Sequence, residues 1–356
     1  MAIVIQERHN FGLGGYQSPV QEPKVTTTQV ANAAFVLCPG QGAQHVGMGQ
    51  SWGQSYPTAV ATFEEADQCL GFALSEICFT GPEQQLCRTD IAQVAIYTTS
   101  VACYRVLLET GQITGPSAAA GLSLGEFTAL HLGGAFDFAS GLRLVHLRGQ
   151  AMQDAAEATE SSMVAITGNS DPEQIEQLCA QARGNGVLVP ANFNSPMQVV
   201  ISGSTDACAR AIAEADQMGL KATALTVAGA FHSPLMQPAA DRLATALDTI
   251  DWQLPRIPIL SNVTAKPHHQ GEGGIESIKC HLVEQLTHPV RWSQSMQAAA
   301  QQYPGRFIEL APGKVLSGLM RRIDRKTKVE NFAEPPPAEP GGNPKTTQPS
   351  PAQWLV

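Results

Sequence analysis

Residues 117–130 read SAAAGLSLGEFTAL. The small residues at the start of this stretch predict a short buried strand, and the apolar residues after Leu124 predict a helix. Between them, residues 121–125 form a G-x-S-x-G pattern with Ser123 at its centre. The two glycines remove side chains that would clash where a strand turns sharply into a helix. The stretch therefore predicts an α/β fold in which this turn presents Ser123 as a nucleophile.

A serine nucleophile needs a base that accepts its proton. Of the nine histidines in the chain, the best candidate is His232 in AGAFHSPLM. It follows a predicted strand that ends near Val227 and precedes a helix that starts near Pro234, so we expect it in a turn, where functional side chains gather. His131 and His146 fall within helical patterns, which favours a structural role for both.

The order of these residues argues against an α/β-hydrolase triad. Such an enzyme would place an acidic residue after the serine, and then a histidine near the chain end. Here a whole predicted subdomain separates Ser123 from His232, and a long folded stretch follows the histidine. No acidic residue is obviously placed to complete a triad. We therefore expect acyl-transfer chemistry on a different scaffold, or a serine–histidine dyad.

Two other kinds of site are disfavoured. Residues 35–49, FVLCPGQGAQHVGMG, are glycine-rich after a strand but lack the G-K-[ST] end of a phosphate loop. The alternative for this loop is a backbone N–H donor at Gln41 that contacts an oxyanion. Four histidines late in the chain fit no standard ligand spacing, so we expect no metal. They are His268, His269, His281 and His288.

The pattern of predicted elements divides the chain into domains. Residues 1–33 are polar and aperiodic, which predicts a flexible leader, and the Pro-rich residues 331–356 predict a disordered tail. Residues 161–228 give strand and helix signals in the order βαββαβ, which is typical of a ferredoxin-like subdomain. This subdomain is inserted into a large α/β domain formed by residues 34–160 and 229–330.

Composition limits the classes of partner. Hydrophobic residues make up 43% of the chain and charged residues 15%, as in a globular protein. The net charge of −9 disfavours nucleic acid and anionic membranes as partners.

The sequence has no secretory signal and no apolar run of about 18 residues. None of the eight cysteines forms a C-x-x-C pair. We expect reduced thiols and a cytoplasmic protein, with an organelle transit segment as the alternative.

Six motifs in order resemble the malonyl-CoA:acyl carrier protein transacylase family and the related acyltransferase domains of polyketide synthases. They are PGQGAQHVGMG, GLSLGEFTAL, LRGQAMQ, NFNSPMQVVISG, AFHSPLM and the run from VEQLTHPVRW through ELAPGKVLSGL. The resemblance covers about residues 34–325. It implies a hydrolase-like core of mostly parallel strands with the ferredoxin-like insert. It also implies ping-pong transfer of malonyl from malonyl-CoA to the pantetheine thiol of acyl carrier protein, supplying fatty-acid synthesis, with no cofactor. We expect a monomer.

The resemblance assigns roles residue by residue. Ser123 would be the acylated nucleophile and His232 the base, and the backbone N–H groups of Gln41 and Leu124 would form the oxyanion hole. A main-chain carbonyl usually orients the imidazole in this family, which fits the missing acid. One position departs from the pattern, because Leu122 stands where many members carry histidine before the serine. That puts one side-chain contact in the pocket in doubt.

Arg148 would grip the malonyl carboxylate, for which its planar, bidentate guanidinium is suited. Only the resemblance distinguishes it, because on helical spacing alone both Arg148 and Arg143 would be interpreted as solvent-facing charges. Gln285 matches a family glutamine near the histidine and is a further candidate for the substrate site.

Three other functions remain open at this stage. A free-standing acyltransferase serving a polyketide synthase would share every catalytic residue. A hydrolase would cleave esters without a carrier protein. A decayed scaffold would bind carrier proteins without catalysis, and the intact Ser123, His232 and Arg148 argue against it.

Overall fold

The computed structural model describes residues 33–168, 171–268 and 273–337. Almost all of the expected leader and most of the expected tail lie outside these ranges. The large domain extends beyond its expected boundary at residue 330, because a strand at Val329–Phe332 completes its sheet. Trp52 Nε1 then donates to the carbonyl of Ala333, which fixes the chain beyond that strand.

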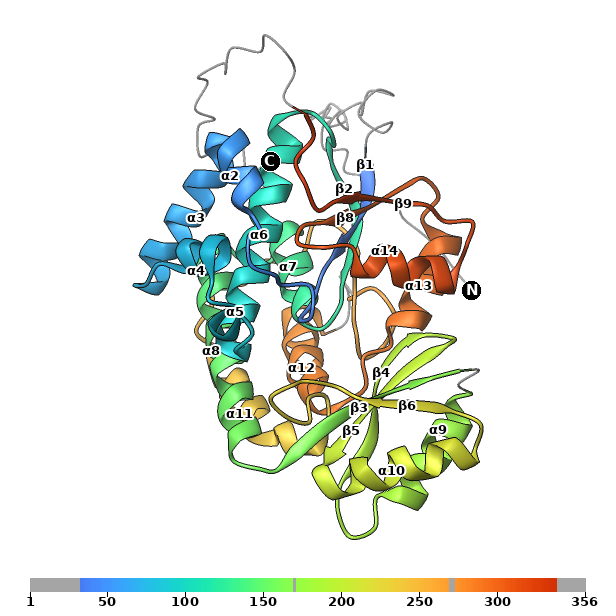
Figure 1. The fold of residues 1–356 in the computed structure, drawn as a ribbon. Helices are drawn as coiled ribbons and strands as arrows, with labels where there is room; N and C mark the ends of the chain where they lie inside the picture. The colour runs from blue at the N-terminus through green and yellow to red at the C-terminus, as the bar shows by residue number, and fades with distance from the viewer. Residues whose placement is uncertain (1–32, 169–170, 269–272, 338–356) are drawn as a thin grey trace, which may run out of the picture.

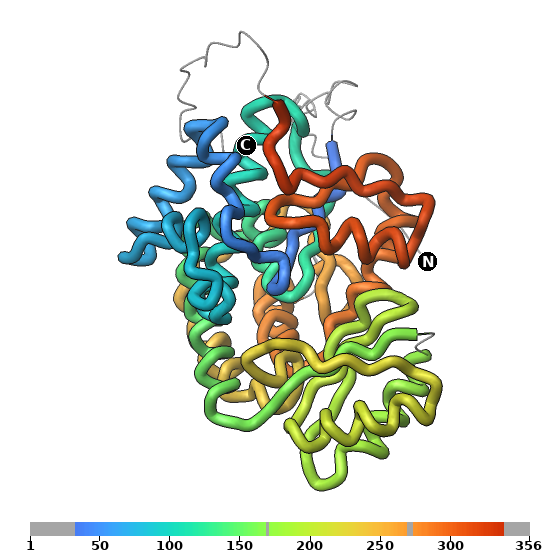
Figure 2. The backbone as a smooth tube through the Cα atoms, viewed as in Figure 1, coloured from blue at the N-terminus to red at the C-terminus, as the bar shows by residue number. Residues whose placement is uncertain are grey.

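A five-stranded parallel sheet forms the centre of the large domain (Figure 1). Its strands, in spatial order, are β7 (Ile259–Leu260), β2 (Gly115–Gly121), β1 (Ala33–Cys38), β8 (Arg306–Leu310) and β9 (Val329–Phe332). The first and last parts of the described chain therefore lie side by side, as the blue and red segments show in Figure 2.

Both faces of this sheet are covered, as expected for parallel strands. Along β1, Val36 and Cys38 face one hydrophobic cluster, while Phe35 and Leu37 face another. The second cluster is completed by apolar residues of the two helices drawn beside the sheet at the red end of the chain, α13 (Trp292–Gln302) and α14 (Val315–Ile323).

The remaining helices of the large domain pack mainly against the first cluster. They are α2 (Gln50–Ser55), α3 (Pro57–Leu70), α4 (Leu74–Thr80), α5 (Glu83–Leu86), α6 (Thr89–Glu109), α7 (Leu124–Leu132), α8 (Phe138–Glu157), the 3-10 helix η1 (Pro234–Met236), α11 (Gln237–Leu247) and α12 (Gly274–Thr287). Of these, α6 is long and apolar enough to span a membrane, but 83% of its most apolar window is buried inside the protein. We therefore interpret α6 as a core helix.

The inserted subdomain is a four-stranded antiparallel sheet with two helices, drawn at the bottom of Figure 1. Its spatial strand order is β4-β5-β3-β6, which is the ferredoxin-like order. The elements in chain order are β3 (Ser161–Thr167), α9 (Pro172–Ala182), β4 (Leu188–Ser195), β5 (Gln198–Ser204), α10 (Thr205–Gln217) and β6 (Lys221–Ala224). Asp171 caps the start of α9, since its carboxylate accepts the N–H of Glu173 at 3.2 Å.

Backbone hydrogen bonds join the two subdomains. The N–H of Phe193 in β4 donates to the carbonyl of Val290 at 2.9 Å, and the N–H of Val290 donates to the carbonyl of Ala191 at 2.8 Å. Val290 belongs to the segment between α12 and α13 of the large domain. Asn192 and Val290 thus form a parallel β-bridge, which places this segment of the large domain beside β4.

The turn between β2 and α7 is packed too closely for any side chain at its glycines. A Cβ at Gly125 would lie 2.1 Å from the carbonyl oxygen of Cys38, and one at Gly121 would lie 1.8 Å from the backbone of Gly125. These are contacts with backbone atoms, which cannot move without displacing β1 or α7.

We therefore expect Gly125→Ala to lower the free energy of unfolding by about 3 kcal/mol or more. Overpacking a core typically costs about 1–3 kcal/mol, and here the clash is with backbone atoms. Gly318→Ala is the matched control, because Gly318 lies inside α14 with no atom within 4 Å of its missing Cβ. This control should be neutral or stabilising by about 0.5–1 kcal/mol. Urea unfolding of both variants measures the difference, and similar values for the two would refute the packing argument.

Candidate active site

Ser123 lies at the junction of β2 and α7 with φ 52° and ψ −105°. A positive φ is strained for a residue with a side chain, so surrounding contacts must hold it. Asn262 does so from the segment after β7: its Oδ1 accepts the Ser123 N–H at 2.7 Å, and its Nδ2 donates to the Gly121 carbonyl at 2.8 Å. The serine side chain is thereby presented at a fixed angle and remains partly exposed.

His232 meets the serine from the turn before η1. Its Nε2 lies 2.9 Å from Ser123 Oγ, and its Nδ1 lies 2.6 Å from the backbone carbonyl of Gln285. A carbonyl only accepts, so Nδ1 carries the proton and Nε2 is free to accept from the serine hydroxyl. The geometry is that of a base oriented by a main-chain carbonyl.

The charge state of His232 suits the same role. Burial lowers its pKa to about 4; the hydrogen bond to Gln285 opposes this shift, and the positive charge of Arg148 adds to it. The imidazole is therefore neutral at pH 7, as a proton acceptor must be.

Arg148 points from α8 toward the serine and is 1% exposed. Its Nη2 donates to Ser123 Oγ at 3.0 Å and to Gln285 Oε1 at 2.9 Å, and its Nη1 donates to Gln93 Oε1 at 2.6 Å. Within the described part of the chain, no carboxylate forms an ion pair with this guanidinium, and its Nε has no hydrogen bond. Burial lowers its pKa to about 9, which still leaves it charged at neutral pH.

The structure separates the two arginines that helical spacing could not. Arg143 lies on the exposed side of α8, where it contacts Ser140 Oγ and Cys69 Sγ. Arg148, five residues later, is buried beside the serine. His131 and His146 also lie apart from Ser123: His131 Nδ1 contacts the carbonyl of Phe136, and His146 contacts Gln150.

Two backbone N–H groups, those of Gln41 and Leu124, are the ones expected to stabilise an oxyanion. Leu124 is the first residue of α7, where helix N–H groups are unpaired and the dipole is positive. The loop with Gln41 lies against the turn, because a Cβ at Gly40 would be 2.2 Å from the Leu122 carbonyl oxygen. Within the described ranges, neither the Gln41 nor the Leu124 N–H has a hydrogen-bond partner. The side chain of Leu122 packs against the second hydrophobic cluster, the one that α13 and α14 complete.

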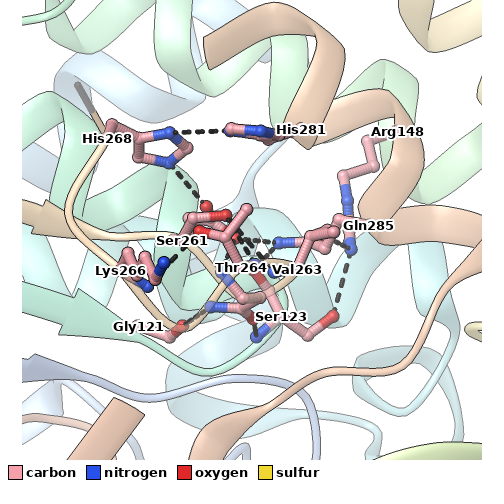
Figure 3. A network of polar contacts seen from close by, with 12 residues as sticks. Gly121, Ser123, Arg148, Ser261, Val263, Thr264, Lys266, His268, His281 and Gln285 are labelled. Carbon is pink, nitrogen blue, oxygen red and sulfur yellow. Dashed lines mark hydrogen bonds and ion pairs between the residues drawn. The ribbon is translucent and has the colours of Figure 1, made fainter. Parts of the chain in front are cut away.

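Behind these groups lies a polar network that sequence reasoning found only in part (Figure 3). Gln285, found through the resemblance, donates from Nε2 to the Ser123 carbonyl at 3.0 Å and to Glu126 Oε2 at 2.6 Å. Glu126, Gln93 and Asn262 were missed. An acidic residue in the first turn of a helix already has an ordinary explanation in the helix dipole, so Glu126 gave no separate signal.

Of the four late histidines, the three that the structure describes do not form a cluster with metal-ligand geometry. His268 Nε2 lies 2.7 Å from Glu126 Oε1, and His281 Nδ1 lies 3.5 Å from His268 Nδ1. His288 contacts its own helix, and His269 lies outside the described residues. Among the residues that the structure describes, no group of three or more potential ligands could hold a metal ion.

Comparison with known proteins places this arrangement in a family. The sequence model that describes the acyl transferase domain family matches residues 34–334 of this chain. The chain belongs to the acyl transferase family. The malonyl CoA-acyl carrier protein transacylase of Escherichia coli (strain K12) is 42% identical over 303 residues, which cover 85% of this chain and 96% of the relative. That of Bacillus subtilis (strain 168) is 40% identical, covering 84% and 93%.

Solved structures agree with this placement of the acyl transferase. The malonyl CoA-acyl carrier protein transacylase from Coxiella burnetii superposes with a TM-score of 0.81 at 37% identity, covering 85% of this chain and 95% of that one. A malonyl-transacylase in complex with its type II polyketide synthase acyl-carrier protein gives 0.80 at 38% identity, covering 86% and 97%. The family and the two-part α/β fold predicted from the motifs are confirmed.

Proposed function

We propose that this acyl transferase moves a malonyl group from malonyl-CoA to the pantetheine thiol of acyl carrier protein, through a malonyl ester on Ser123. One observation carries the proposal. Ser123 Oγ lies 2.9 Å from the neutral base His232 and 3.0 Å from the buried cation Arg148. The nucleophilic oxygen thus contacts both a base and a group that can bind a carboxylate. The names of the transacylase relatives support the same substrates.

In the first half-reaction, Ser123 Oγ attacks the thioester carbonyl of malonyl-CoA while His232 Nε2 accepts the hydroxyl proton. The negative charge that develops on the carbonyl oxygen is stabilised by the N–H groups of Gln41 and Leu124. The carbon–sulfur bond then breaks, and CoA leaves as a thiol after taking the proton from His232. The product is malonyl-Ser123.

In the second half-reaction, the carrier's pantetheine thiol gives its proton to His232 and attacks the ester carbonyl. The same two N–H groups stabilise the oxyanion, and Ser123 regains the proton when the carbon–oxygen bond breaks. Every step uses groups of the chain or its two substrates, so we propose that the reaction needs no cofactor.

Arg148 selects the acyl group in this proposal. A buried guanidinium without an ion pair is costly, and a substrate carboxylate compensates it. Malonyl supplies that carboxylate, whereas acetyl leaves the guanidinium as it is. Gln93 and Gln285 hold the guanidinium from two sides, so it meets the substrate with little reorganisation.

The setting of the reaction is also a proposal. All eight cysteines are free, which supports a reducing compartment such as the cytoplasm. Fatty-acid synthesis is the pathway we favour. A polyketide pathway is the second candidate, because one relative is a polyketide biosynthesis malonyl CoA-acyl carrier protein transacylase, at 37% identity. We propose that the enzyme acts as a monomer.

A basic groove offers a docking place for the acidic carrier. It is lined by Arg321, Arg322, Arg325 and Lys328 after and within α14, and by Met197 in the turn between β4 and β5. Carrier proteins of this pathway are usually acidic, so this local positive charge would steer them despite the chain's net charge of −9.

Ser123→Ala is expected to abolish the malonyl-enzyme adduct, because only the serine oxygen attacks. His232→Ala should slow transfer by roughly 10²–10⁴-fold, the usual contribution of a positioned base. Mass spectrometry of the protein after mixing with malonyl-CoA measures the adduct, and a carrier assay measures the rate. His146→Ala serves as the control and should behave as the wild type. A malonyl adduct on the Ser123→Ala protein would disprove the assignment.

Arg148→Ala is expected to lower kcat/KM for malonyl-CoA by about 30-fold or more, since losing one partner of a buried charge pair costs 2 kcal/mol or more. Acetyl transfer should be unchanged or faster. Arg143→Ala on the same helix is the matched control and should alter neither substrate. Equal losses for malonyl and acetyl would mean that Arg148 supports the fold or the CoA moiety instead.

Reversing charge in the groove with Arg321→Glu and Arg322→Glu should raise KM for the carrier about tenfold and weaken the salt dependence of the second half-reaction. Acylation by malonyl-CoA alone should not change. Lys326→Glu adds the same type of charge change to an exposed residue nearby that does not line the groove. If the control and the double variant raise KM equally, the groove is not the docking place.

A further inference from the structure

A buried carboxylate lies behind the site without a part in the reaction described above. Glu126 is in the first turn of α7, three residues after the nucleophile, and is 1% exposed. Burying a carboxylate is unfavourable unless its oxygens accept hydrogen bonds from well-placed donors. Its partners therefore indicate what it does.

The donors to Glu126 come from three separate parts of the large domain. Its Oε2 accepts from Gln285 Nε2 at 2.6 Å and from the backbone N–H of Asn262 at 3.2 Å. Its Oε1 lies 2.7 Å from His268 Nε2. Asn262 also clamps the strained serine turn, and Gln285 also contacts Arg148. One carboxylate thus links both supports of the site.

These contacts fix the orientation of the Gln285 amide. Its Nε2 faces two groups that only accept, the Glu126 carboxylate and the Ser123 carbonyl. That end of the amide must therefore be the NH₂ group, and the oxygen must face Arg148, which only donates. Without the carboxylate, the NH₂ group would lose its shortest hydrogen bond, and the longer contact with the Ser123 carbonyl would be left to hold that end of the amide. The amide oxygen that accepts from Arg148 would then be less firmly placed.

The far side of Glu126 is held by a histidine pair. His268 is buried, and since Glu126 accepts, its Nε2 carries a proton. Its Nδ1 faces Nδ1 of His281, which is partly exposed on α12. Figure 3 labels His281 and His268 in the upper part of the view, with Gln285 and Ser123 below them. Glu126 is thereby held at both carboxylate oxygens, by His268 at Oε1 and by Gln285 at Oε2.

We propose that Glu126 is a positioning residue for malonyl recognition: it fixes the Gln285 amide and so holds Arg148 in the orientation that receives the substrate carboxylate. This inference rests on the proposed function. The base is independent of it, because His232 is held by the backbone carbonyl of Gln285 and not by the amide. Loss of Glu126 should therefore harm malonyl more than acetyl.

The test compares kcat/KM for malonyl-CoA and acetyl-CoA in variants of the whole chain. Glu126→Leu removes the acceptor and should lower the malonyl value by about 10–100-fold, by analogy with the loss of a group that orients a metal-binding side chain. The acetyl value should fall less, so the malonyl preference shrinks. Glu126→Gln keeps an acceptor oxygen for Gln285 and should restore most of the preference. Equal losses for both substrates, or no recovery in Glu126→Gln, would overturn the proposal.

Two further variants separate positioning from stability. His268→Phe keeps a ring but removes a donor to Glu126, so it should shift the preference in the same direction by a smaller factor. It provides the test if Glu126→Leu fails to fold, and an unchanged preference would then count against the proposal. Glu309→Gln is the control, because this buried carboxylate instead accepts the N–H groups of Leu316 and Ser317 at 2.7 Å each. It should lower Tm and leave the preference unchanged.

Adduct formation by the wild-type chain separates a failure of the proposed function from a failure of the role of Glu126. If the wild-type chain forms no malonyl-Ser123 with malonyl-CoA, the proposed function fails, whatever the variants do. If it forms the adduct and the preference in Glu126→Leu matches the wild type, only the role of Glu126 fails.

Discussion

The site depends on the contact between two backbones at the centre of the large domain. The first turn of α7 approaches the end of β1 so closely that Gly125 touches the carbonyl of Cys38 and Gly40 touches that of Leu122. This approach forces the chain through a strained serine and brings the loop before Gln41 against the residue that precedes the serine. The strain is sustained because the parallel sheet is buried on both faces and Asn262 bonds both sides of the turn.

Around that contact, the site is built from buried polar groups that satisfy one another. Gln285 is central, since its backbone carbonyl orients His232 while its side chain bridges Arg148, Glu126 and the serine backbone. A charged guanidinium can be buried here because two amide oxygens accept from it, yet it keeps no direct ion pair among the described residues. The arrangement is stable in the free enzyme and still open to a carboxylate, which is the compromise that substrate selection requires.

Much of the architecture could be predicted from the sequence, because its signals are local. The strand–turn–helix pattern around Ser123 and the βαββαβ order of the insert each depend on short stretches of chain. The end of β9 at Phe332 could not be predicted in this way, because this strand is short and joins the sheet only through pairing with β8. Glu126 and Asn262 could not be found in this way, since their importance lies in contacts between residues more than 130 positions apart. Arg148 and Arg143 differ only in burial, which tertiary packing decides.

The bridge between β4 and the segment around Val290 bears on how the two subdomains are held against each other. Two backbone hydrogen bonds join the subdomains at that junction. A hinge motion that separated the subdomains there would have to break both of them. The basic groove spans the same two parts of the molecule, with Met197 on one rim and the α14 residues on the other. The two rims of the groove are therefore already joined by the fold before anything binds there. A carrier protein docking on this surface would meet a preformed partner, and little of its binding free energy would be lost in ordering the two subdomains.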